Sequence, residues 1–94
     1  MKSVIKKELQ ESFKQFIYSL NFDEIYSNNI LISNIEKFEL ELVKETSNSS
    51  KKLKILFKKL FNSISEKEKE KNQYLVDINL KIMALLSPRY RTQG

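Results

Sequence analysis

The fold of this chain is inferred most directly from KKLKILFKKLFNSI, the stretch from Lys51 to Ile64. Wound as an α-helix at about 100° per residue, the stretch separates into two faces. The apolar face consists of Leu53, Leu56, Phe57, Leu60, Phe61 and Ile64. The opposite face carries one apolar residue, Ile55, among Lys51, Lys52, Lys54, Lys58 and Lys59. The pattern predicts a helix that packs on a core and leaves a positive surface.

The apolar residues outside this stretch recur at steps of three and four, which is typical of amphipathic helices. We expect four helices, at about residues 4–20, 30–45, 51–63 and 66–86, followed by a flexible tail over 87–94. Ser33 and Ser65 each begin an S-x-x-E capping box, and Pro88 cannot continue the last helix. Residues 22–29 are expected to form at most a short helical turn.

These elements predict a single all-α domain, an antiparallel four-helix bundle without an internal repeat. The last helix is apolar on two sides, because Val76, Leu80 and Met83 form a stripe beside its main core face. Two interpretations fit this second stripe. Either the last helix contacts two neighbours within the bundle, or the stripe is an oligomer interface.

The composition excludes several classes of site. The 94 residues include no cysteine and no histidine, so disulfides, thiolate sites and histidine ligands are all excluded. The only glycine is Gly94, which rules out a glycine-rich phosphate-binding loop. The acids lie beside lysines at helical spacing, as in helix-stabilising ion pairs. We therefore expect no catalytic residues, no metal, no cofactor and no enzymatic activity.

Charge is distributed unevenly along the chain. Residues 1–46 hold six lysines against eight acids, a net charge of −2, whereas residues 47–94 hold nine lysines and two arginines against four acids, a net charge of +7. This asymmetry favours an acidic or polyanionic partner for the second half. The alternative is that the two halves neutralise each other. Our candidate partner-binding residues are Lys51, Lys52, Lys54, Ile55, Lys58, Lys59, Arg89, Tyr90 and Arg91.

Three kinds of partner suit these residues. A nucleic acid would be bound through its phosphate backbone in a salt-sensitive way, although arginine, the better bidentate ligand, is scarce. A membrane surface or a membrane-protein partner would have anionic headgroups near the lysines, with Ile55 as an apolar anchor. Because the apolar face of this helix is expected to lie in the core, peripheral contact or docking to a protein is favoured over insertion. No apolar run is long enough to span a bilayer and the N-terminus lacks a signal-peptide core, so we expect a cytosolic protein.

The segment from Leu56 to Ile82 carries a family resemblance. There, LFKKLFNSI is followed by a serine-initiated, glutamate-rich helix start and then by YLVDINLKI. With the length, the basic charge and the protruding C-terminal segment, it resembles the small bacteriocin immunity proteins of lactic acid bacteria, the enterocin A-type group. The chain lacks the glycine-containing tail that often follows the last helix in that family.

The resemblance implies an antiparallel four-helix bundle that protects the producing cell from its own pore-forming peptide. It implies action on the cytosolic side, at a membrane receptor complex loaded with bacteriocin, with specificity in the C-terminal half. The main hypothesis is therefore a non-enzymatic interaction protein of the immunity type. The alternatives are a nucleic-acid-associated accessory protein and an assembly subunit that pairs through the last helix.

Overall fold

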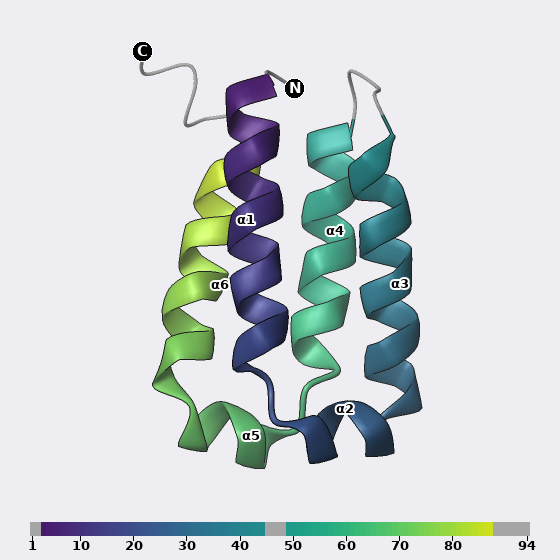
Figure 1. Cartoon of the computed structure of the whole chain (residues 1–94), viewed down its shortest axis with the longest axis vertical. Helices are drawn as coiled ribbons and strands as arrows, with labels where there is room; N and C mark the ends of the chain where they lie inside the picture. Colours follow the sequence, from purple (N-terminus) through teal and green to yellow (C-terminus); the bar gives the residue numbers. More distant parts are fainter. Residues whose placement is uncertain (1–2, 45–48, 88–94) are drawn as a thin grey trace.

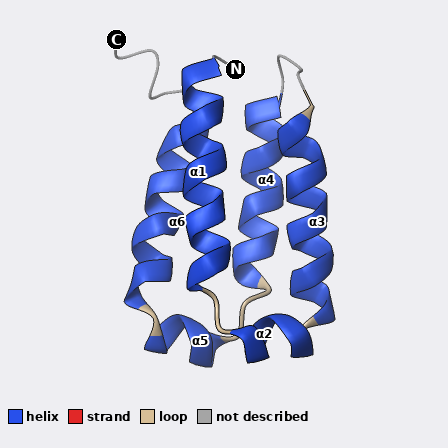
Figure 2. Cartoon of the chain, viewed as in Figure 1, coloured by secondary structure: helices blue, strands red, loops and turns tan. Residues whose placement is uncertain are grey.

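The computed structural model describes residues 3–44 and 49–87, and within these ranges the regular structure is entirely helical (Figure 2). This confirms the all-α prediction. The described residues form six helices rather than four: α1 (Ser3–Ser19), α2 (Phe22–Ser27), α3 (Asn29–Val43), α4 (Ser49–Asn62), α5 (Glu66–Lys71) and α6 (Gln73–Leu86).

The four longer helices lie alongside one another, and the two short ones lie across one end (Figure 1). Followed along the chain, α1 and α4 run in one direction and α3 and α6 run in the other. Helix α3 packs on α4, α1 packs on α6, and α4 also contacts α6. The ends of α1, α3 and α4 fall within a few residues of the predicted ends.

Two predictions about the helices were wrong. The single helix expected over 66–86 is interrupted at Asn72, whose φ of −122° and ψ of 86° are not helical. Helix α3 begins at Asn29, close to its expected start at about residue 30, and not at the Ser33 capping box, because the Asn28 side chain accepts the Leu31 backbone N–H at 3.0 Å. Residues 22–27, expected to give at most a turn, form α2.

The interruption at Asn72 has a local cause. Its side-chain amide donates to the backbone carbonyl of Ser19 at 2.8 Å, where α1 ends. The last carbonyls of a helix have no partner within that helix, so an amide from another segment stabilises the helix end. Asn28 does the same for α4, donating to the Ser63 carbonyl at 2.8 Å. Each asparagine thus has a non-helical backbone conformation and caps a long helix. Asn72 caps α1, and Asn28 caps α4.

The core lies between the four long helices and is centred on aromatic side chains. The Phe57 ring lies 5.1 Å from the Phe16 ring and 5.5 Å from the Phe38 ring, and Phe13 lies 4.4 Å from Phe38, all between ring centroids. The buried apolar residues are Leu9, Phe13, Phe16, Leu20, Leu31, Phe38, Leu42, Leu53, Phe57, Leu60, Ile64, Leu75, Ile78, Ile82 and Leu86.

This core reveals an internal repeat, contrary to the expectation from the sequence. Adding 44 to the number of every buried apolar residue in the first half gives a buried apolar residue in the second half, and only Ile78 is left over. The pairs are Leu9 and Leu53, Phe13 and Phe57, Phe16 and Leu60, Leu20 and Ile64, Leu31 and Leu75, Phe38 and Ile82, and Leu42 and Leu86. Residues 3–44 and 49–87 are hereafter the first and second halves.

The hydrogen bonds repeat with the same offset of 44 residues. The Ser19 hydroxyl donates to the Phe16 carbonyl at 2.8 Å, and Ser63 donates to Leu60 at 2.6 Å. Asn28 and Asn72 have nearly the same backbone angles, and each caps the long helix of the other half. Because the caps made by Asn28 and Asn72 are reciprocal between the halves, the halves are related as two subunits of an isologous dimer are.

Replacing the two interrupting asparagines tests this account of the fold. Asn28→Ala removes three side-chain hydrogen bonds, to Leu31, Glu24 and Ser63, whereas Asn72→Ala removes one, to Ser19. Because a hydrogen bond lost at a partly buried site costs about 1 kcal/mol, we expect Asn28→Ala to lower the free energy of unfolding by about 2–3 kcal/mol and Asn72→Ala by about 1 kcal/mol. Urea denaturation measures both. The exposed Asn62→Ala is the control, and a cost for it equal to that of Asn28→Ala would contradict the account.

Candidate functional site

The lysine surface of α4, defined as Lys51, Lys52, Lys54, Ile55, Lys58 and Lys59, faces outward as the pattern predicts. Four of the lysines are exposed and Lys54 is half-buried, while Leu53, Phe57 and Leu60 on the opposite face are buried. Ile55 is 52% exposed, a large fraction for an isoleucine in a folded domain. The helix therefore presents an apolar side chain surrounded by ammonium groups.

Only one lysine of this surface is neutralised within the described chain. The Lys52 Nζ lies 3.4 Å from Oε1 of Glu41, a buried carboxylate of α3 that also lies 3.4 Å from the Lys44 Nζ. Within residues 3–44 and 49–87, the other four lysines form no ion pair. Mutual neutralisation of the halves, the alternative explanation of the charge asymmetry, thus accounts for Lys52 alone.

The internal repeat shows which of these side chains the fold requires. Helix α1 occupies the equivalent place in the first half and carries Lys7, Glu8, Gln10, Glu11, Lys14 and Gln15 at the positions equivalent to the lysine surface. Both helices therefore pack their apolar faces equally well, one with mixed charges and one with only positive charges. The lysines at positions 52, 54 and 59, together with Ile55, are particular to α4 and are not a requirement of the scaffold.

The other predicted site residues do not form a continuous surface among the described residues. Arg89, Tyr90 and Arg91 lie outside the described residues. In the second stripe of α6, Leu80 is 63% exposed, but Val76 and Met83 are half-buried, and Met83 packs against the core. Because α6 contacts both α1 and α4, the interpretation of α6 as a helix with two neighbours is favoured, and the stripe is not a continuous exposed face.

Two glutamates at the base of the molecule form a reciprocal network that the sequence did not predict. Glu24 of α2 accepts the backbone N–H of Ser65 at 2.8 Å and the Ser65 hydroxyl at 2.9 Å. Glu68 of α5 accepts the backbone N–H of Asn21 at 3.1 Å. In an ordinary capping box, the glutamate binds the N-cap residue of its own helix. Here each glutamate binds the N-cap residue of the other half.

The hydrogen bonds of this network lower the pKa of Glu24. Burial raises the pKa of Glu24, but hydrogen bonds from the Ser65 backbone, the Asn28 side chain and the Ser65 hydroxyl lower it more, so the pKa of Glu24 is below its ordinary value. A general acid needs the opposite shift. A polar hollow of about 220 Å³ lies beside these groups between α2 and α5, and several of the side chains that line it belong to the network.

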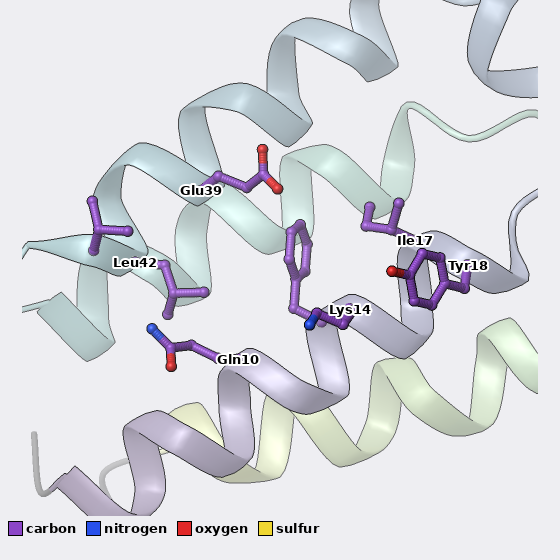
Figure 3. A pocket seen from close by; sticks show the side chains of 8 residues that line it. Gln10, Lys14, Ile17, Tyr18, Glu39 and Leu42 are labelled. Carbon is purple, nitrogen blue, oxygen red and sulfur yellow. The ribbon is translucent and has the colours of Figure 1, made fainter.

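A second surface feature lies between α1 and α3 (Figure 3). It is a groove of about 340 Å³, lined by Gln10, Phe13, Lys14, Ile17, Tyr18, Glu39, Leu42 and Val43. Phe13 and Leu42 are buried in its floor, whereas Tyr18 and Val43 are 78% and 65% exposed. Sequence reasoning missed the groove. The available signal was the presence of Tyr18 and Val43, apolar residues outside the core stripes of their helices.

Neither a metal-ion site in the described residues nor a matching protein indicates a function for the chain. Among the described residues, no group of acidic side chains is arranged to hold a metal ion, and no helix has the length and apolar character needed to cross a bilayer. No protein-family model, curated protein or solved structure matches the chain.

The Glu24 network gives a pH prediction. Because its pKa is lower in the folded than in the unfolded chain, ionised Glu24 stabilises the protein above the unfolded pKa, and this stabilisation is lost as the pH falls through the folded pKa. We expect Glu24→Gln to reduce stability at pH 7 and to make the loss of stability between about pH 5 and pH 3 less steep. Thermal melts from pH 3 to 7 measure this. Exposed Glu36→Gln is the control, and parallel profiles for wild type and Glu24→Gln would contradict the prediction.

Proposed function

We propose that this protein is a non-enzymatic interaction protein that binds an acidic surface of a partner protein through the lysine surface of α4. The observation that carries the proposal is Ile55, half-exposed among four lysines that have no ion pair in the described chain. An apolar anchor surrounded by charged groups suits a protein interface, where a dry centre is enclosed by a polar rim.

A partner protein explains this surface better than a nucleic acid does. Phosphate contacts require positive charge but do not require an apolar side chain at their centre. The described part of α4 carries lysines only, which act as point charges and lack the planar fork with which arginine recognises phosphates and bases. Ile55 would therefore have no role on a phosphate backbone.

The proposal that the protein is not an enzyme is supported by how its titratable groups are placed. The glutamates at the base are held in capping hydrogen bonds. The titratable groups that line the groove are Lys14, Tyr18 and Glu39, and all three are exposed. An active site ordinarily combines an enclosed pocket with a few polar groups that converge on one point.

The specific form of the function that we propose is immunity against a pore-forming bacteriocin, exerted on the cytosolic side of the membrane. The resemblance of Leu56 to Ile82 to the enterocin A-type group supports it. The alternating directions of α1, α3, α4 and α6 support the antiparallel four-helix bundle expected for that group, with α2 and α5 as short additions at one end (Figure 1). The partner would then be a membrane receptor complex with an acidic cytosolic surface.

Removing charge from the lysine surface tests the proposal. Wild type, expressed in a strain sensitive to a pediocin-like peptide, should raise the inhibitory concentration of that peptide. Lys54→Gln, Lys58→Gln and Lys59→Gln together should reduce the protection at least 10-fold, equivalent to about 1.4 kcal/mol of binding. The control combines Lys7→Gln, Lys37→Gln and Lys81→Gln, three exposed lysines elsewhere, with the same net charge.

Two outcomes would contradict the proposal. In the first, wild type gives no protection against any pediocin-like peptide. In the second, wild type binds DNA or RNA at low salt, and the variant at positions 54, 58 and 59 loses this binding while the control keeps it. That second result would establish the nucleic-acid alternative, since phosphate binding weakens with each lysine removed.

A further inference from the structure

The groove between α1 and α3 can be compared with the equivalent place in the second half, between α4 and α6. The floor is alike in the two places, since Phe13 and Leu42 correspond to Phe57 and Leu86, all of them buried. The walls differ: Ile17 and Glu39 of the groove correspond to Phe61 and Met83. The repeat therefore provides an internal reference for what a filled groove looks like.

In the second half, the wall positions hold larger apolar side chains. Phe61 and Met83 both pack against the core, and the Phe61 ring lies 6.5 Å from the Phe57 ring. The Lys69 ammonium group covers the Phe61 ring at 5.2 Å from its centroid, a cation–π contact. Helix α4 is also closer to α6 than α1 is to α3. In the second half, this position is therefore occupied by the Phe61 ring, with the Lys69 ammonium group over it.

In the first half, the equivalent positions hold different side chains. Ile17 is smaller than phenylalanine, and Glu39 is exposed on the α3 side, opposite Lys14 of α1 (Figure 3). The residue equivalent to Lys69 is Ile25, which supplies no charge. The positions equivalent to Phe61 and Lys69 therefore hold neither a ring nor a cation, although Tyr18 and Lys14 line the groove elsewhere, and Glu39 is the acidic side chain among the lining residues.

We propose that the groove binds a peptide segment of a partner protein that presents an aromatic side chain next to a basic residue. The aromatic ring takes the place that Phe61 occupies in the second half, over Phe13 and beside Ile17. The basic residue lies on the α3 side, near the Glu39 carboxylate and away from Lys14. This site is separate from the lysine surface of α4 and selects the opposite charge.

The experiment uses full-length protein and a synthetic peptide, acetyl-Ala-Lys-Phe-Arg-Ala-amide, followed by methyl NMR. We expect saturable shifts of the Ile17, Leu42 and Val43 methyl groups, and no saturable shift of Leu80, which is exposed on α6. Peptides with alanine in place of phenylalanine, or with glutamates in place of both basic residues, should bind at least 10-fold more weakly. Absence of binding by the first peptide, or equal binding by the glutamate peptide, would overturn the proposal.

Substitutions taken from the second half give a matched test of the site. Ile17→Phe combined with Glu39→Met should fill the groove, weaken peptide binding at least 10-fold and raise the thermal midpoint. Leu80→Ala is the control and should leave binding unchanged. Should the double variant fail to fold, Glu39→Gln alone is expected to weaken binding 3-fold or more without changing the groove. Binding that is unaffected by Glu39→Gln would exclude the proposed basic partner residue.

Discussion

The structure depends on satisfying the helix ends at the base of the molecule, where α1 meets α2 and α4 meets α5. Unpaired carbonyls and N–H groups at helix ends are costly when partly buried, and nothing within one half satisfies them all. Asn28 and Asn72 cap the long helix of the opposite half, and Glu24 and Glu68 cap the opposite short helix. The two halves therefore stabilise each other's helix ends, which fixes how the four long helices are arranged.

Because these bonds and the core recur at an offset of 44 residues, the repeat separates the scaffold from the surface. The paired core positions and the capping residues keep their chemistry in both halves, as with Phe13 and Phe57 or Glu24 and Glu68. Many exposed positions differ between the halves. Glu11 corresponds to Ile55. Phe22 and Tyr26, whose rings stack and are exposed on α2, correspond to Glu66 and Glu70. The chain thus contains its own comparison.

Much of the fold followed from the sequence, and the reasons for the failures are physical. Steps of three and four located the long helices and nearly all of the core, because burial of one helix face is a local property of the pattern. The break at Asn72 was missed because KEKEKN, residues 67–72, is a good helix former. The hydrogen bond that stabilises the break joins the Asn72 side chain to the Ser19 carbonyl, 53 residues away in the sequence. The Ser65 capping box was half right: Ser65 accepts the Glu68 N–H, but Glu24 takes the Ser65 N–H. The lysine surface was predicted, whereas the groove depends on the spacing of two helices, which no single helix pattern contains.

The lysine surface and the groove each differ from the equivalent place in the other half of the repeat. Helix α4 carries lysines around Ile55 at positions where α1 carries mixed charges. Between α1 and α3, the groove has the same buried floor as its counterpart but has Ile17 where the second half has Phe61. Neither change disturbs the capping network, because the substituted positions make none of its hydrogen bonds. The two halves can therefore differ on their outer surfaces while they keep the same contacts at the base and in the core.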